Sequence, residues 1–328
     1  MKYYLSIDIG ASSGRHILSS VQDGKLVLEE VYRFENGMTQ KDGHLVWEYE
    51  KLFSNIIAGL KECKKLGKIP VSVGIDTWGV DYALIDADGK VIGDVYAYRD
   101  GRTEEPIKKV HEIIPFETLY KRTGSQFQIY NTIYQLYTDK LSGKLDKAER
   151  FLMMPDFFNY LLTGVMKNEF TNASTTGLMS AKTRDWDMET VKELDLPEKL
   201  FKELSDPATF VGNLKPEIAK EIGYDLKVVL PATHDTASAV MAVPEIGQPL
   251  YISSGTWSLL GIESPVAIST EEALKENFTN EGGYERSTRF LKNIMGLWMI
   301  QCVRREYNKK YSWGDFVTLS KEVKDFDS

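Results

Sequence analysis

Two short segments of this chain share one pattern, and together they limit the folds that it can adopt. Residues 4–15 read YLSIDIGASSGR and residues 251–258 read YISSGTWS, so each is a β-rich run that breaks into Ser-Ser-Gly. Small hydroxyl residues that end in glycine form tight turns whose N–H groups can point one way and bind anions, phosphates above all. Two such turns in two halves of the chain, the first beside Asp8, predict a nucleotide held between two domains.

The order of the expected elements indicates an α/β fold. An antiparallel meander is predicted from three strand candidates that are separated by turns, at residues 2–9, 15–20 and 25–34. A helical period follows over residues 48–65, and residues 71–76 and 81–85 then read as strands. This is the order of an actin-like, ribonuclease-H-like ATPase domain, with a mostly helical insertion over residues 104–213.

A second domain is expected after a joint at residues 244–249, which is bounded by two prolines. Before the joint, residues 228–232 read as a strand that runs into His234. We therefore predict a first domain at residues 1–243 and a second at residues 244–328.

The charge balance and the apolar runs limit the cellular locations and the binding partners that this protein can have. The formal net charge is −8 and no basic block stands out, which argues against nucleic acid as a partner. The apolar runs fall short of the ~20 residues that a membrane span needs, and Asp8 interrupts the one at the N-terminus. Cys63 and Cys302 are expected as reduced thiols. The sequence thus predicts a cytoplasmic protein, a monomer or a homodimer, that acts on a small molecule.

Asp8 is the first candidate site residue. An acid at a strand end beside a phosphate turn is placed to hold Mg²⁺, usually through water; the alternative is an aspartate that only caps the turn. Arg15 could reach the transferring phosphate or lie on the turn. Residues 10–14 also fit the G-x-S-x-G elbow of hydrolases. That elbow requires an earlier strand and a following helix, and the sequence around Gly14 offers neither.

Asp235 is the second candidate, because it follows one strand and begins a helix. An aspartate there can simply cap the helix. It can also act as general base, because phosphoryl transfer to an alcohol needs a carboxylate that accepts the hydroxyl proton. The neighbouring His234 could bind a sugar hydroxyl or be structural.

A sugar site is suggested by Trp78 with Asp81, and by Arg99 with Asp100. Sugars present an apolar face and a ring of hydroxyls, which an aromatic ring and polar side chains match. The alternatives are core packing for Trp78 and a surface turn for Arg99 and Asp100.

Seven segments, in order along residues 3–313, together resemble the FGGY carbohydrate kinases, and within them those that act on L-rhamnulose. They are DIGASSGR (8–15), GIDTWGVD (74–81), YRD (98–100), MPD (154–156), HDTASA (234–239), SSGTWS (253–258) and KNIMGLW (292–298). The resemblance implies an ATP-dependent kinase that phosphorylates the 1-hydroxyl of L-rhamnulose in L-rhamnose breakdown.

The resemblance also implies a role for individual residues. Asp235 is implied as the catalytic base, and Asp8 as the acid on the magnesium side. The implied ATP contacts are Ala11, Ser12, Ser13, Gly14, Arg15, Thr256, Asn293 and Gln301. The implied substrate contacts are Gly79, His234, Asp235 and Thr236. Trp78 and Arg99, which were suggested above as parts of a sugar site, complete the set of predicted substrate contacts.

Other functions stay open at this point: a kinase for L-fuculose or xylulose, a non-catalytic sugar-binding fragment, or a filament or chaperone ATPase of the same fold. Family members run well past 328 residues, so the second domain is expected to be incomplete, with exposed apolar surface and unpaired strand edges. We then expect residues 250–328 to be poorly stabilised and ATP to bind weakly or not at all, with the sugar site intact.

Overall fold

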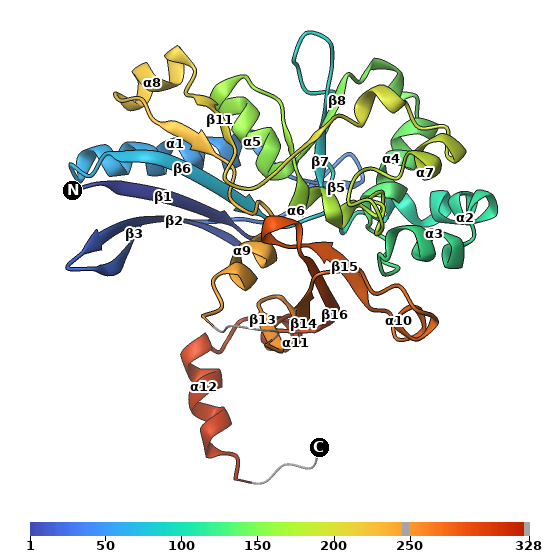
Figure 1. Cartoon of the computed structure of the whole chain (residues 1–328). Helices are drawn as coiled ribbons and strands as arrows, with labels where there is room; N and C mark the ends of the chain where they lie inside the picture. Colours follow the sequence, from blue (N-terminus) through green and yellow to red (C-terminus); the bar gives the residue numbers. More distant parts are fainter. Residues whose placement is uncertain (245–248, 325–328) are drawn as a thin grey trace.

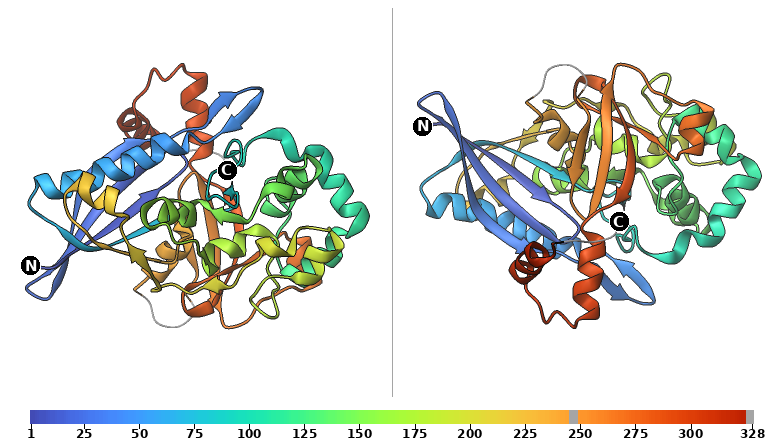
Figure 2. Two further views of the ribbon diagram at one scale, coloured as in Figure 1. Left: turned by 90° about the horizontal axis from the view of Figure 1, so that it is seen from above. Right: turned by 90° about the horizontal axis from the view of Figure 1, so that it is seen from below.

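The computed structural model describes residues 1–244 and 249–324, and it contains two main β-sheets surrounded by helices (Figure 1). The C-terminal region, residues 249–324, lies behind the rest of the chain in the view from above and in front of it in the view from below (Figure 2). It therefore packs on one side of the N-terminal region, residues 1–244. Residues 245–248, within the predicted joint, lie outside the described residues. Among the described helices, none combines the length and the hydrophobicity that crossing a membrane requires.

Six strands form the first sheet, in the order β11-β12-β6-β1-β2-β3: β1 (Tyr3–Ile9), β2 (Ser13–Gln22), β3 (Lys25–Glu35), β6 (Pro70–Thr77), β11 (Phe210–Asn213) and β12 (Lys227–Val229). β1, β2 and β3 pair antiparallel, which confirms the predicted meander. β6 lies between β1 and β12 and is parallel to both. Parallel neighbours need long crossover connections, and the helices between these strands supply them.

Side chains alternate along β1, and this alternation gives the two faces of the sheet different roles. Leu5, Ile7 and Ile9 are buried, whereas Ser6 and Asp8 point to the opposite face. The first face therefore forms the core, and the second face is free to carry polar groups.

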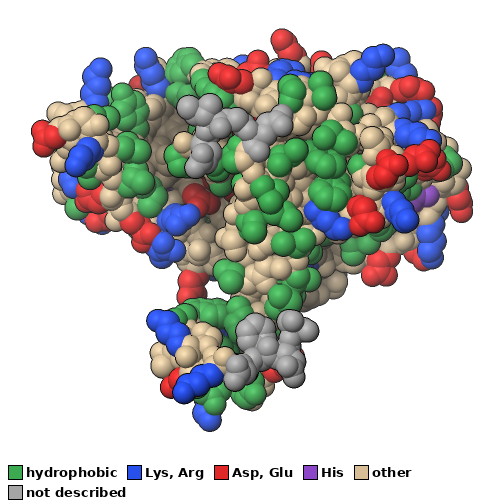
Figure 3. All heavy atoms as spheres, turned by 60° about the horizontal axis from the view of Figure 1, so that its bottom comes forward, with side chains coloured by type: hydrophobic (Ala, Val, Ile, Leu, Met, Phe, Trp, Pro, Cys, Tyr) green, Lys and Arg blue, Asp and Glu red, His purple; other side chains and the backbone are tan. Residues whose placement is uncertain are grey.

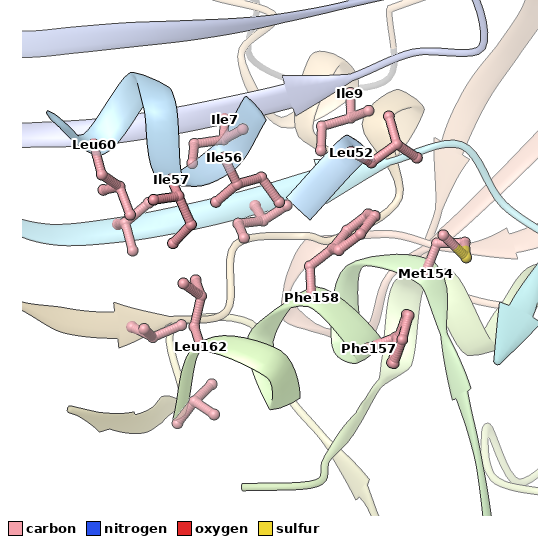
Figure 4. Packing of buried hydrophobic residues seen from close by; sticks show 14 of the residues in the cluster. Ile7, Ile9, Leu52, Ile56, Ile57, Leu60, Met154, Phe157, Phe158 and Leu162 are labelled. Atoms are coloured by element: carbon pink, nitrogen blue, oxygen red, sulfur yellow. The ribbon is translucent and has the colours of Figure 1, made fainter. Parts of the chain in front are cut away.

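Three helices cover the core face: α1 (Tyr49–Lys65), α5 (Met154–Thr163) and α8 (Pro216–Ile222). α1 confirms the predicted helix and buries the face that contains Ile56 and Leu60. Figure 4 shows Ile56 of α1 and Phe158 of α5 packed in one cluster with Ile7 of β1. Burial of each such side chain contributes about 1.5–3 kcal/mol, so this layer holds the sheet to its helices.

The segment between β6 and β11 is mostly helical, as predicted, and it has an apolar cluster of its own. The strand predicted at residues 81–85 forms, but it pairs only with one other strand in a separate two-stranded sheet and does not extend the main sheet. The helices are α2 (Glu104–Ile113), α3 (Phe116–Thr123), α4 (Thr132–Leu141), α6 (Phe170–Ala173) and α7 (Met188–Glu193). The short strands, with two from the preceding loop, are β4 (Thr39–Lys41), β5 (His44–Val46), β7 (Tyr82–Ile85), β8 (Arg150–Met153), β9 (Asn168–Glu169) and β10 (Leu204–Ser205).

The C-terminal region contains the second sheet, in the order β13-β14-β16-β15: β13 (Tyr251–Ser254), β14 (Trp257–Ser264), β15 (Thr279–Gly282) and β16 (Thr288–Met295). All its described pairings are antiparallel. α9 (Asp235–Met241) follows β12 and packs near β13, and α10 (Glu271–Lys275) connects β14 to β15.

Two helices end the described chain, α11 (Trp298–Glu306) and α12 (Trp313–Glu322), and neither contains a buried residue. In α12, Trp313 and Val317 expose 48% and 55% of their surface. Apolar side chains also lie exposed on β13, where Ile252 is 62% exposed, and Figure 3 shows hydrophobic groups gathered on this side of the molecule. The expected exposure of apolar surface in this region is therefore present.

We predict that backbone amides in α11 and α12 exchange with solvent faster than those in β1 and β6. Local opening is easier where few side chains are buried, and these helices bury none. Hydrogen–deuterium exchange of the native chain, followed by mass spectrometry, measures this directly. Equal protection of α12 and β1 would contradict the prediction.

Candidate active site

Three neighbouring strands bring acidic residues to one edge of the first sheet. Asp8 of β1 and Asp76 of β6 are direct neighbours in the parallel register. The chain beyond β12 continues beside β6, because Thr77 N–H donates to the Thr233 carbonyl at 3.0 Å and Thr77 forms a bridge with His234. The carboxyl ends of parallel strands are where α/β proteins bind ligands.

A cavity of about 600 Å³ opens at this edge and is lined by residues of both sheets. Its size falls in the range of small-molecule sites, roughly 300–1,000 Å³. The structure brings together most of the predicted site residues on its wall: Asp8, Ala11, Ser12, Ser13, Arg15, Trp78, Gly79, His234, Asp235, Thr236, Thr256 and Asn293.

The two Ser-Ser-Gly segments both reach the cavity, but they occupy different positions in their hairpins. In the first hairpin Ser12 lies in the turn and Ser13 begins β2, whereas Ser253 and Ser254 end β13 before the turn. The residues that correspond between the two hairpins are Gly10 and Gly255, each of which begins its turn. The N–H group of Gly10 donates to the Ser13 carbonyl, and that of Gly255 donates to the Trp257 carbonyl. The two segments therefore differ in detail, although both hairpins contribute residues to the cavity wall.

Asp8 is paired with Arg15, its neighbour across β1 and β2. Nη2 and Nε of Arg15 lie 2.7 and 2.9 Å from the same carboxylate oxygen, Oδ2. Both side chains are partly exposed on the cavity wall, so the pair is accessible to a ligand. Arg15 thus lies beside the turn, bonded to Asp8, and it also lines the cavity, so a contact with phosphate stays a prediction.

Asp76 is a site residue that the sequence analysis did not single out. Burial raises the pKa of its carboxyl group well above the usual range, and the negative charges of Asp8 and Asp235 raise it further. The signal was present, because Asp76 comes near the end of a buried strand just as Asp8 does. Only the parallel register of β1 and β6 shows that the two carboxylates are neighbours.

Asp235 is the first residue of α9, and His234 occupies the N-cap position. Its carboxylate accepts a hydrogen bond from the Thr236 hydroxyl at 3.0 Å, and the exposed 34% of the side chain lies on the cavity wall. Burial raises the pKa of Asp235 to about 6, although the bond from Thr236 opposes the shift; the negative charge of Asp8 adds to it. A carboxylate of this kind is suited to accept a proton near neutral pH.

The turn before Asp235 is fixed by Glu169, a fully buried residue that the sequence analysis also missed. One of its oxygens, Oε2, accepts hydrogen bonds from both N–H and hydroxyl of Thr233, at 3.1 and 2.6 Å. The Thr233 carbonyl accepts in turn from the Asn172 side chain at 3.2 Å. These contacts tie the turn before Asp235 to residues 169 and 172, which are distant in the sequence, and so they fix the position of Asp235.

Trp78 lines the cavity, but Asp81, which was predicted beside it, and Asp100, which was predicted beside Arg99, hold the protein's own loops and strands in place. Asp81 is buried, and its Oδ2 accepts from the indole N–H of Trp47 and of Trp78, at 2.7 and 2.9 Å, and from Tyr98 N–H at 3.0 Å. Asp100 likewise accepts from the backbone N–H groups of Leu45 in β5 and of Arg102. As sugar contacts these two acids were wrongly predicted, because their oxygens are already used within the protein.

Three other predicted residues do not line the cavity. Gly14 is buried in β2, where a side chain would clash with the ring of Phe34. Arg99 stacks on Trp298, with Cζ 4.2 Å from the ring centroid. Gln301 lies on α11, away from the wall. Gly14 and Arg99 thus contact other parts of the protein, and the ligand contacts of all three residues stay predictions.

The turn after β6 is strained and held by several hydrogen bonds. Val80 has φ +69°, a left-handed conformation that is rare for a β-branched residue. Its N–H donates to Thr175 Oγ1 at 2.9 Å, and its carbonyl accepts from Thr132 Oγ1 at 2.7 Å. Gly79 is required here, because a Cβ atom would lie 2.7 Å from Thr175. Such strain persists where surrounding contacts fix the backbone, often beside ligand sites.

Further polar groups reach the cavity from the loop between α3 and α4 and were not predicted. Ser125, Gln126, Gln128 and Asn131 all line the wall. Gln126 is 6% exposed, and its Oε1 has no hydrogen-bond partner among the described residues. The loop reads GSQFQIYN, and sequence alone does not show that its amides face the strand ends.

Comparison with known families places these observations in a class. Residues 3–242 match the N-terminal domain of the FGGY family of carbohydrate kinases, and residues 250–324 match its C-terminal domain. The chain therefore belongs to the FGGY family of carbohydrate kinases. The resemblance found in the sequence and the predicted class of enzyme are thus confirmed.

Curated relatives named rhamnulokinase are similar over nearly the whole chain. The protein from Halalkalibacterium halodurans is 50% identical over 98% of this chain and 69% of its own length. The one from Oceanobacillus iheyensis is 47% identical over 97% of this chain and 68% of its own length. The relative from Bacillus subtilis is 42% identical, with 98% and 67% covered. This chain thus spans about two thirds of each relative.

Solved structures support the predicted fold. A xylulose kinase from Lactobacillus acidophilus superposes with a TM-score of 0.81 at 17% identity, over 98% of this chain and 66% of that one. A glycerol kinase from Plasmodium falciparum, solved with ADP, gives a TM-score of 0.79 at 17% identity, over 99% and 67%. The actin-like, ribonuclease-H-like fold class is therefore confirmed.

Activity at low pH should report the ionisation of Asp235. A general base must be ionised to take up a proton, so we expect kcat/KM to fall by roughly tenfold per pH unit as the pH drops below about 6. The sign follows from burial: it favours the protonated form, so activity is lost at a higher pH than an exposed aspartate would allow. The pH profile of sugar-dependent ADP release measures this.

Thr236→Val serves as the companion variant. It removes the hydroxyl that lowers the pKa of Asp235, so the acid limb of the profile should move to higher pH. A wild-type profile that stays flat down to about pH 5 would show that another group accepts the proton.

Proposed function

We propose that this protein catalyses the ATP-dependent phosphorylation of L-rhamnulose at the 1-hydroxyl, giving L-rhamnulose 1-phosphate in L-rhamnose breakdown. The observation that carries the proposal is the presence of Asp235, Asp8 and both hairpin turns on the wall of one cavity. The choice of sugar is supported by curated relatives named rhamnulokinase at 42–50% identity. The proposal keeps the division into domains at residues 1–243 and 244–328, a cytoplasmic location, and a monomer or homodimer.

On the sugar side of the cavity, we assign Trp78 and Gly79 with His234 and Thr236 as substrate contacts. The Trp78 ring packs against Trp47 at an interplanar angle of 40°, with centroids 4.2 Å apart, which fixes the apolar surface that a sugar face can cover. The amides of the loop between α3 and α4 add hydrogen-bonding groups near the same wall. Buried polar groups that a hydroxyl would satisfy give selectivity among ketoses.

On the nucleotide side, we assign the turn at residues 11–13, with Arg15, and Thr256 and Asn293 of the second sheet. Backbone N–H groups in such turns can hold phosphate oxygens. Arg15 is already within 2.7 Å of Asp8 and adds a positive charge beside them. The phosphates would therefore lie between the two hairpins.

Magnesium fits Asp8 better than it fits an all-protein cage. Among the described residues, no group of three or more acidic, histidine or cysteine side chains is arranged to hold a metal ion. Mg²⁺ keeps several waters and is usually bound by one or two carboxylates together with substrate phosphates. When bound, the ion would neutralise negative charge on the phosphates, and Asp8 would hold it through water.

The chemical step assigned to this chain's residues is the removal of one proton. The 1-hydroxyl oxygen bonds to the terminal phosphorus of ATP, and the bond from that phosphorus to the bridging oxygen breaks, which releases ADP. Asp235 takes the hydroxyl proton and orients the oxygen for in-line attack. Residues of the second sheet line the cavity opposite the first sheet, and closure of the two over the ligands would limit access of water, which would otherwise accept the phosphoryl group.

The proposal predicts that Asp235→Asn lowers kcat by about 10²–10⁴-fold, because the amide cannot accept the proton. The dissociation constant for L-rhamnulose should change by less than about threefold, because the amide keeps the shape of the carboxylate. A coupled assay for ADP release and calorimetry with the sugar measure the two quantities. Xylulose and L-fuculose as substrates test the choice of sugar.

The matched control is Asp195→Asn, since the Asp195 side chain is 90% exposed and does not line the cavity. This control should keep wild-type kcat. An Asp235→Asn enzyme with near-normal turnover would remove Asp235 from the mechanism. Faster turnover of another ketose would instead replace the sugar.

A further inference from the structure

A buried arginine from the second sheet reaches the histidine next to the proposed base. Arg289 lies on β16 and is 0% exposed. Its Nη2 is 2.9 Å from Nδ1 of His234 and 3.1 Å from a carboxylate oxygen of Glu281, and its Nε donates to the Gly282 carbonyl at 2.9 Å. The contact therefore joins β16 to the turn that begins α9.

This contact selects one form of the histidine. A guanidinium group has only donors, so at 2.9 Å from Nη2 the Nδ1 atom of His234 accepts and the ring proton is on Nε2. A carboxylate oxygen of Glu281 also lies near Nδ1, at the longer distance of 3.4 Å. Nε2 lies 3.5 Å from Oδ1 of Asp235, on the wall of the cavity. Burial lowers the pKa of His234 well below its usual value, and the positive charge of Arg289 lowers it further, which keeps the ring neutral.

We infer that Arg289 is a positioning residue for phosphoryl transfer, which acts through His234 by fixing the neutral ring with its N–H on Nε2, the ring nitrogen on the side of Asp235 and of the cavity. The inference rests on the function proposed for the same cavity. Arg289 itself does not line the wall, so its effect on the substrate would pass through His234.

A purely structural role explains this arginine poorly. Taking a charge out of water costs several kcal/mol, and an apolar side chain of similar volume often stabilises a core as well or better. Glu281 offsets the charge, but Nη1 of Arg289 has no partner among the described residues. The arginine is therefore placed for its donor toward His234, and it makes the orientation of that ring depend on docking of the second sheet.

The tautomer can be observed by ¹⁵N NMR of histidine-labelled protein. The chain has four histidines, and the signals of His234 are identified by their loss in His234→Gln. In the wild type at pH 7.5, we expect the two nitrogens to show a protonated Nε2 and an unprotonated Nδ1. A proton on Nδ1 of wild-type His234 would overturn the inference, whatever the variants do.

In Arg289→Met, we expect His234 to populate both neutral tautomers and kcat to fall by 10–100-fold, with ATP affinity within threefold of wild type. Arg289→Lys has a compact ammonium group in place of the planar guanidinium group. Its tautomer population and its kcat should therefore lie between those of the wild type and of Arg289→Met. A folded Arg289→Met protein with wild-type tautomer and wild-type kcat would overturn the inference.

Arg102→Met is the matched control, because Arg102 is also a buried arginine paired with an acid, Asp139, and it does not line the cavity. It should leave the His234 signals unchanged. If Arg289→Met does not fold, the wild-type spectrum and Arg289→Lys decide the question. A chain with the expected tautomer but no activity on L-rhamnulose would contradict the proposed function and leave the tautomer assignment standing.

Discussion

The parallel register between β1, β6 and the chain beyond β12 is the constraint on which the core and the cavity both depend. It aligns Leu5 with Val73 and Ile7 with Ile75, so apolar residues of adjacent strands form one continuous layer under the helices. The same register places Asp8 beside Asp76 on the opposite face. One set of backbone hydrogen bonds thus determines what is buried and which carboxylates meet.

Around this edge, buried acids act as hydrogen-bond acceptors that hold loops in place. Asp81 accepts hydrogen bonds from two indole N–H groups and one backbone N–H, and Glu169 accepts from the backbone N–H and the hydroxyl of Thr233. Groups oriented before the ligand arrives do not have to reorganise during the reaction, which is how a protein stabilises developing charge. Arg289 and His234 extend this arrangement to the second sheet.

Local sequence was sufficient for elements and residues whose signal is contained in one segment. The meander, α1 and the strand-end acids Asp8 and Asp235 were predicted because turns, helical period and position after a strand are local properties. Asp81 was misassigned because a local pattern does not reveal whether a carboxylate faces ligand or buried indoles. Glu169 and Arg289 were missed because their partners lie 64 and 55 residues away in the chain.

The alternation of side chains in β1 has a consequence for how this chain can change. Inserting or deleting a single residue ahead of Asp8 would turn the aspartate toward the helices and a branched aliphatic side chain toward the ligand. Folding and turnover would then fail together. Variation that survives in this strand must therefore come as replacements at fixed length, and a designer who wishes to alter the donor site has to work from the hairpin tips.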